Sequence, residues 1–278
     1  MIKYINDIKP YSIATLTLLF ILFNSFSGCK PKPTPAPAAA MGSLIFHFHT
    51  FAGNQEDTDS MQVYINQDNR NMRLYFSNIF ISNIRLITSA GDTIAPLPDT
   101  VVLKHFDEET YPLGHVPAGN YKTVKFDVGL AAKINHSNPA SYPSSEPYSL
   151  LNSAWVWPTS MWSGNTTNGY NFVTIKGLID TSASGKGVPT QPFLYKLGGD
   201  NTRTTILMPE QDFTVASGVP FTVHMTIDFG YFLHGLNPKT QNTCNFVSNP
   251  TLAATIAKNM IPYDKDGSAM PAMFRYEY

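Results

Sequence analysis

The sequence has few charged residues and almost no cysteine. Charged residues make up 14% of its 278 residues, whereas about 25% is usual for a soluble domain. Lys and Arg number 19 against 20 Asp and Glu. There is thus no basic excess to neutralise phosphates, and we expect no nucleic-acid partner. The two cysteines, Cys29 and Cys244, exclude a framework of disulfide bonds.

The sequence also lacks the short motifs that mark common enzyme classes. It contains no Gly-Xaa-Ser-Xaa-Gly, no His-Glu-Xaa-Xaa-His, no phosphate-binding loop and no dinucleotide fingerprint. Its acidic residues show no spacing that picks out an acid–base pair. We therefore expect a protein that is not an enzyme.

The N-terminus has the features of an export signal. Lys3 and Lys9 precede an apolar run over residues 13–23, which is shorter than the about 20 residues of a membrane-spanning helix but suits a signal peptide. Phe26-Ser-Gly-Cys29 follows and resembles a bacterial lipobox. The resemblance implies cleavage before Cys29 and lipidation of that cysteine. We expect residues 1–28 to be a lipoprotein signal peptide.

The segment after Cys29 predicts where the protein resides. Residues 29–42 are rich in Pro and Ala, a composition typical of an extended spacer. Lys30 stands where an acidic residue would favour retention in the inner membrane. We therefore expect a lipid-anchored protein of the cell envelope, held in the outer membrane and facing the periplasm. After cleavage, Cys244 has no partner in the chain and is expected to be a buried or free thiol.

Alternation of apolar and polar residues dominates the rest of the chain and predicts β-strands. Turn signals rich in Gly, Pro, Asn and Asp separate the alternating segments. The clearest strand predictions are residues 43–51, 72–87, 121–130, 172–179 and 221–231. One helix is expected near residues 250–259, with Asn249 as its cap and Pro250 in its first turn. We predict an all-β fold: one antiparallel β-sandwich domain over residues 43–278, with long loops and one short C-terminal helix.

Three histidines fall on polar faces of predicted strands. His47 and His49 are two residues apart, so their side chains lie on one face, about 6.5–7 Å apart along the chain. Imidazole nitrogen is a preferred ligand of copper and similar metals. His224 shares a strand face with Asp228, a carboxylate that could orient its ring. The alternative is that all three are ordinary surface histidines, with His47 and His49 opposite a core face.

All three tryptophans of the chain lie in the long irregular stretch of residues 135–168. They are Trp155, Trp157 and Trp162, and Tyr170 follows closely. Such a cluster could form a stacking platform for a sugar ring, or it could cap the core of the sandwich. The first possibility predicts a glycan- or partner-binding lipoprotein without metal.

Several segments, taken in order, resemble the periplasmic copper-binding proteins that are encoded with methanobactin cassettes, the MbnP and MbnP-like family. They cover nearly the whole domain from Leu44 onward. The matching stretches are residues 75–86, 116–129, 135–137, 161–164, 169–172, 176–177, 193–198 and 254–259.

The resemblance implies a β-sandwich that binds copper without catalysis. It also implies a partner, a di-haem peroxidase-like protein that oxidises a Trp of the copper protein to kynurenine, whose aromatic amine can ligate the metal. Carried over to this chain, Trp162 is the candidate for oxidation, and the candidate ligands are His224 with His47 or His49. We predict His47, His49 and His224 as metal ligands, with Trp162 at or near the site.

Two positions depart from the family pattern. Gly164 stands where many relatives carry a second Trp, and Lys196 stands where many carry a His. Each departure removes a potential ligand or modification site. They motivate a third hypothesis, in which the chain is a structural envelope lipoprotein that has kept the fold and lost the metal.

Overall fold

The computed structural model describes residues 39–53, 55–56, 61–94, 100–105, 108–155, 160–262 and 272–277. The predicted signal peptide, the lipidation site Cys29, most of the predicted linker, and Trp157 lie outside the described residues. From Ala39 onward the chain forms one compact unit.

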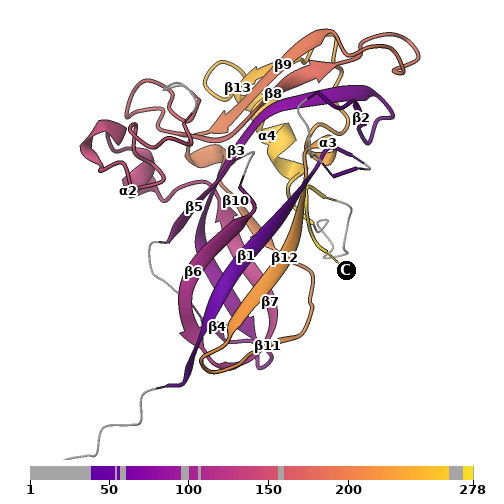
Figure 1. The fold of residues 1–278 in the computed structure, drawn as a ribbon. Helices are drawn as coiled ribbons and strands as arrows, with labels where there is room; N and C mark the ends of the chain where they lie inside the picture. Colours follow the sequence, from indigo (N-terminus) through magenta and orange to yellow (C-terminus); the bar gives the residue numbers. More distant parts are fainter. Residues whose placement is uncertain are drawn as a thin grey trace, which may run out of the picture. The chain divides into compact units, whose positions relative to one another are not determined.

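The described strands form two sheets (Figure 1), and the predicted all-β sandwich is confirmed. The smaller sheet has the strand order β14-β12-β1-β6. Its strands are β1 (Met41–Phe51), β6 (Thr110–Pro117), β12 (Pro220–Asp228) and β14 (Phe274–Tyr276).

The larger sheet has the order β10-β7-β3-β8-β9-β13, and β2, β4, β5 and β11 pair beside this path. Its longest strand is β3 (Asn71–Thr88), one continuous strand that includes the predicted residues 72–87. The others are β2 (Tyr64–Ile65), β4 (Thr93–Ile94), β5 (Val101–His105), β7 (Gly119–Val128), β8 (Asn171–Ile179), β9 (Gln191–Gly198), β10 (Thr204–Leu207), β11 (Phe213–Val215) and β13 (Thr243–Asn245).

Most described strand pairings are antiparallel, but two are parallel. β13 pairs with β9 in parallel, and β1 pairs with β12 in parallel at the centre of the smaller sheet. In this register Phe46 lies opposite Val223 and Phe48 lies opposite Met225. Both strands thereby turn their apolar residues to the same face, which a slip of one residue would expose to water.

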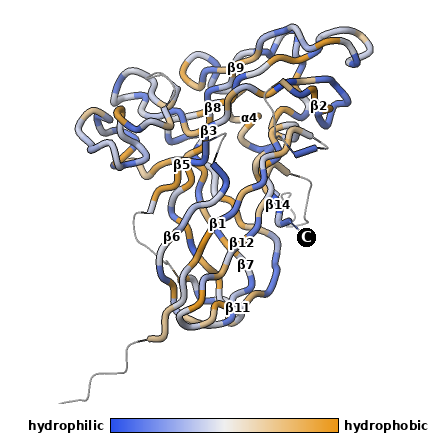
Figure 2. The backbone as a smooth tube through the Cα atoms, viewed as in Figure 1, coloured by the Kyte–Doolittle hydropathy of each residue, from blue (hydrophilic) through white to orange (hydrophobic). Residues whose placement is uncertain are grey.

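The main core lies between the two sheets. Phe46 of β1 contacts Phe126 of β7 edge to face, with 6.3 Å between ring centroids, and Phe126 contacts Phe274 of β14 at 5.2 Å. The alternation of hydrophilic and hydrophobic residues along the strands can be followed in Figure 2. A second cluster of buried residues packs on the other face of β3, around Phe80, Trp155 and Tyr170.

Short helices complete the described part of the chain. They are α2 (Ala132–Asn135), α3 (Phe229–Phe232) and α4 (Pro250–Lys258), with 3-10 turns at Pro139–Ser141 and Asp200–Thr202. No described helix has the length and apolar character needed to cross a bilayer.

The helix α4 confirms the predicted C-terminal helix, but its cap differs from the prediction. Asn249 occupies the N-cap position without a capping hydrogen bond from its side chain. Its amide oxygen instead accepts a bond from the Ser248 hydroxyl at 3.2 Å. Pro250, which needs no N–H partner in the first turn, begins the helix as expected.

The predicted strand over residues 221–231 ends early, at Asp228. Its carboxylate accepts the Tyr231 N–H at 3.1 Å and caps helix α3, which takes over the last three residues of the predicted strand. An Asp at this position favours a helix start because it satisfies one of the free N–H groups there.

Candidate metal centre

The three predicted histidines lie together on the outer face of the smaller sheet. In the parallel register of β1 and β12, His47 is directly opposite His224, and His49 follows on the same face of β1. The centroid of the His47 ring is 4.6 Å from that of His49 and 5.1 Å from that of His224. Each residue offers one nitrogen, and these nitrogens all lie within 4.8 Å of one another. We call His47, His49 and His224 the histidine group.

The strand periodicity explains why the histidine group is accessible. Residues 44, 46, 48 and 50 of β1 are buried, and the histidines alternate with them. The side chains of His47 and His49 are each 22% exposed, and that of His224 is 52% exposed. Backbone hydrogen bonds of the sheet hold the rings near one another, while a metal ion can still approach from solvent.

Neighbouring side chains hold the rings of His47 and His49. Nδ1 of His47 lies 2.8 Å from the Thr110 hydroxyl, on the paired strand β6. Nδ1 of His49 lies 2.5 Å from Oε1 of Glu56, and its Nε2 lies 3.0 Å from Oε2 of Glu277. Each ring of this pair is thus oriented by a hydrogen-bond partner, as is usual for metal-binding histidines.

Carboxylates surround the histidine group on several sides. Glu109 reaches to 3.8 Å from Nε2 of His47, and Glu277 to 3.9 Å from Nδ1 of His224. His49, Glu56 and Glu109 also form a second set whose potential ligand atoms lie within 4.8 Å of one another. We call Glu56, Glu109 and Glu277 the carboxylate ring.

Sequence reasoning did not find the carboxylate ring. Glu109 precedes β6 and Glu277 follows β14 directly, and Glu56 forms a bridge with Phe51 outside the named strands. None of these positions belongs to a periodic pattern that would link it to a histidine. Only the pairing of distant strands brings them to the site.

The two β1 histidines have opposite shifts in pKa. Partial burial lowers the pKa of His47, and the nearby imidazole of His49 lowers it further. Partial burial also lowers the pKa of His49, but the hydrogen bond with Glu56 and the charges of Glu277, Glu56 and Glu109 together raise it above the ordinary value. In the absence of metal, a proton therefore binds His49 more readily than His47.

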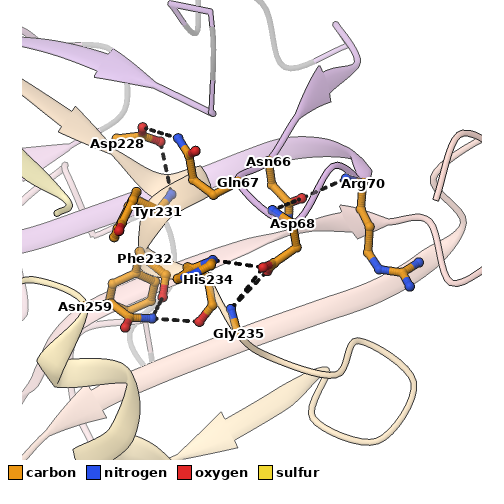
Figure 3. Close-up of polar contacts among 10 residues, drawn as sticks. All are labelled: Asn66, Gln67, Asp68, Arg70, Asp228, Tyr231, Phe232, His234, Gly235 and Asn259. Atoms are coloured by element: carbon orange, nitrogen blue, oxygen red, sulfur yellow. Dashed lines mark hydrogen bonds and ion pairs between the residues drawn. The ribbon is translucent and has the colours of Figure 1, made fainter. Parts of the chain in front are cut away.

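Asp228 does not orient His224, contrary to the interpretation of their shared strand face. Its carboxylate is fully buried and accepts hydrogen bonds from Gly53 N at 2.9 Å, Gln67 Nε2 at 3.2 Å and Tyr231 N at 3.1 Å. Arg275 Nη1 lies at 3.1 Å. Figure 3 shows Gln67 and Tyr231 meeting this carboxylate. Covering residues close over the C-terminal end of β12, whereas His224, in the middle of the strand, is exposed.

The described members of the aromatic cluster do not form one surface platform, which was one of the two possibilities that the sequence left open. Trp155 and Tyr170 are buried in the second core cluster, where Trp155 Nε1 donates to Pro147 O at 3.0 Å. Trp162 is half-buried, with its ring centroid 4.8 Å from that of Tyr170. Two of the four proposed members thus serve as core, because large rings gain more from burial than from exposure. No contact described for Trp162 joins it to the histidine group.

The other histidines have partners outside the histidine group. His105 pairs with Glu108 at 3.0 Å, His136 with Asp200 at 3.0 Å, and His234 with Asp68 at 2.8 Å, the last visible in Figure 3. Cys244 is a buried free thiol, as predicted, and burial raises its pKa to about 11.

A family model named MbnP matches residues 41–246 of the chain. The chain belongs to the MbnP family. This confirms the resemblance seen in the sequence. Among solved structures, MbnP from Methylosinus trichosporium is similar to this chain, with 14% identity over 69% of this chain and 77% of that chain and a TM-score of 0.46. No curated protein matches the chain.

The MbnP match includes the histidine group and ends before the C-terminal strand. His47, His49 and His224 fall within residues 41–246, whereas β14 and Glu277 lie beyond them. The donor set fits a copper ion, because imidazole nitrogens suit copper, zinc and related metals and carboxylate oxygens can complete their coordination. His47, His49 and His224 would hold the ion, with the carboxylate ring around it.

Proposed function

We propose that this chain is a non-catalytic copper-binding protein whose ligands are His47, His49 and His224. The observation that carries the proposal is the convergence of three imidazoles from two strands, with one nitrogen of each within 4.8 Å of the others. A sheet is a rigid support for the three side chains. Both ring nitrogens of His49 contact carboxylates, so its contact with Glu56 or with Glu277 would give way to the ion. Membership in the MbnP family supports copper as the metal.

The ligand chemistry also supports copper. For a given site of nitrogen and oxygen donors, affinity among divalent first-row metals is highest for copper. Three imidazoles, two of them oriented by hydrogen bonds, give such a site. The protein would hold or pass on the ion and would not turn over a substrate.

A copper titration of the purified protein tests this function. We expect about one copper per chain, since the histidine group offers one set of three imidazoles. His49→Ala or His224→Ala should weaken binding at least about 100-fold, because a ligand is lost outright. His115→Ala is the matched control, since His115 lies exposed on β6 of the same sheet and contacts Ser43 instead. No copper bound would leave the metal-free structural role, whereas equal copper binding by all variants would mean that the ligands lie outside the histidine group.

The same proposal places the protein in the cell envelope through a lipid on Cys29, in the outer membrane and facing the periplasm. The lipobox-like segment before Cys29 supports this. Cys29→Ser should release the protein from membranes into the soluble fraction and remove the lipid mass. A variant that stays in the membrane fraction would rule out this anchor.

A modification of Trp162 by a di-haem peroxidase-like partner is the remaining part of the proposal. Trp162 is half-buried, and its ring packs against that of Tyr170. Peptide mass analysis of protein from its native host should show the mass change of kynurenine at Trp162, and Trp155 should be unmodified because it is buried. An unmodified Trp162 would remove the partner from the proposal and leave copper binding by histidines unchanged.

A further inference from the structure

One end of the domain gathers the start of β1 and three tight turns, beside β4 and β11 in Figure 1. The turns join β3 to β4, β6 to β7 and β11 to β12. Gly218 N donates to Met41 O at 2.8 Å, and Ala118 N donates to Ala40 O at 2.8 Å. Ser89 N donates to a carbonyl of the β6–β7 turn at 3.1 Å. We call this surface the entry face; it comprises residues 39–41, 88–92, 117–120 and 216–220.

The entry face is apolar and almost free of charge. Among its residues, Asp92 alone carries a charge, and Ala, Gly and Pro are the commonest types. Met41 is 40% exposed and Val219 is 52% exposed. Just beyond the face, Lys122 and Glu210 form an ion pair with each other at 2.8 Å. Such a surface loses little hydration when it leaves water, and its exposed apolar side chains gain from burial.

Close packing holds the exposed side chains of the entry face from behind. A side chain added at Gly42 would lie 2.4 Å from the Ala216 carbonyl oxygen, so β1 packs directly on the β11–β12 turn. The rings of Phe213 and Phe221 stack across the base of this turn, with 4.9 Å between centroids. Val219 is therefore presented by a rigid turn, which loses little conformational entropy when it meets a partner.

The sequence before the entry face limits how far it can lie from a lipid on Cys29. Residues 29–40 number twelve, and twelve residues span at most about 40 Å when fully extended. Lys30 and Lys32 are the charged residues of this segment, and lysine is attracted to the anionic headgroups of a bilayer. Because the segment joins the domain at the entry face, a lipid on Cys29 keeps that face near the membrane.

We propose that the entry face rests on the phospholipid bilayer, with Met41 and Val219 inserted among the headgroups. The inference rests on the proposed lipid anchor at Cys29. Two side chains bury too little apolar area to hold a soluble protein on a membrane, but a short tether raises their effective concentration at the surface. His47 follows Met41 by six residues along β1, so this contact keeps the histidine group about 20 Å away from the entry face.

The test uses the full lipidated protein with an environment-sensitive fluorophore on the cysteine of Val219→Cys. The native thiols do not interfere, because Cys29 carries the lipid and Cys244 is buried. The protein is placed in vesicles of phosphatidylethanolamine and phosphatidylglycerol that contain a phospholipid with a nitroxide on its headgroup. We expect this nitroxide to quench the reporter at least about threefold more than the same reporter on Val247→Cys, since interfacial side chains lie about 5–10 Å into the headgroup region.

Val247→Cys is the matched control. Val247 is a valine of similar exposure, 48%, and it lies between β13 and α4, away from the entry face. A second variant adds Met41→Asp to the Val219 reporter. It should lower the quenching at least about twofold, because a carboxylate is costly to move out of water, while the protein still sediments with the vesicles. Thermal unfolding of each labelled protein checks that it is folded.

The outcomes separate this inference from the anchor on which it rests. Quenching that is strong at position 219, weak at 247 and reduced by Met41→Asp supports the membrane contact. Protein that sediments with the vesicles but shows equal quenching at 219 and 247 overturns the contact and leaves the anchor standing. Full-length protein from its native host that carries no lipid and does not sediment with vesicles contradicts the anchor, and the contact with it.

Discussion

Asp228 and the carboxylate ring show two ways of placing acidic groups around one pair of strands. Asp228 is fully buried and meets four donors, from Gly53, Gln67, Tyr231 and Arg275. The three glutamates are partly exposed and meet only histidines among their ion-pair partners in the described chain. Asp228 thus has a hydrogen-bond donor for each of its contacts, whereas the three glutamates keep negative charge that the neighbouring histidines do not fully offset.

The difference separates a structural role from a binding role. A buried carboxylate with a complete set of donors holds neighbouring segments together, and its removal leaves those donors unpaired. A partly exposed carboxylate with spare charge contributes little to stability, but it can attract a cation. The predictions below test this division, from the largest expected effect to the smallest.

Replacement of the saturated carboxylate should have the largest effect on stability. We expect Asp228→Ala to lower the free energy of unfolding by about 3–5 kcal/mol, because it leaves Arg275 and the buried N–H groups without their acceptor. Chemical denaturation measures this loss. Asp212→Ala, at an exposed position, should change stability by less than about 0.5 kcal/mol. Equal effects of the two variants would show that Asp228 has no special structural role.

Removal of the charged donor should have a smaller effect. Arg275→Met should lower the free energy of unfolding by about 1–2 kcal/mol, since Arg275 is partly exposed and Asp228 keeps three other donors. The double variant with Asp228→Ala should lose less than the sum of the single losses, because both remove the same contact. Additive losses in a double-mutant cycle would contradict a direct interaction.

The opposite pKa shifts of His47 and His49 predict the order in which they titrate without metal. His49 has the raised pKa, so its stabilising contribution is complete below the ordinary value of 6.5 and is lost as pH rises through its folded-state pKa. His47 has the lowered pKa, so its penalty is absent above 6.5 and develops as pH falls below that value. NMR titration of the ring signals should show His49 losing its proton at the higher pH. The reverse order would mean that the carboxylates do not act mainly on His49.

The smallest effect is expected at Trp162. Trp162→Phe should change the copper affinity of the unmodified protein by less than about twofold, because outer partners alter affinity only when they touch the ligands. Its ring contact is with Tyr170 in the second core cluster. Titration of the variant measures this directly. A large loss of copper would place Trp162 in the ligand set after all.

Much of the fold could be predicted from local pattern. Alternation located β1, β7, β8 and the first part of β12, and Asn249-Pro250 located the start of α4. The period of two also placed His47 and His49 on one face. These features depend on residues that are close in sequence, so a single chain is enough to reveal them.

The remainder depends on partners that are distant in sequence. Nothing in β1 indicates that its neighbour is β12, or that the two run in parallel. The same limit hid Glu277 and Glu109, which reach the histidines only through strand pairing. For the same reason the sequence placed Asp228 on the same accessible strand face as His224. The pattern within β12 does not show that the connection between β1 and β2 covers Asp228.

The pairing of His47 with His224 also has a consequence for how the protein folds. β1 and β12 lie near opposite ends of the described chain, and such long-range pairings form late and slowly. Of the histidine group, only His47 and His49 are close together in an unfolded chain, and His224 joins them when the sheet forms. Copper should therefore slow the unfolding of the native domain far more than it speeds folding, because the complete set of three imidazoles exists only in the native state.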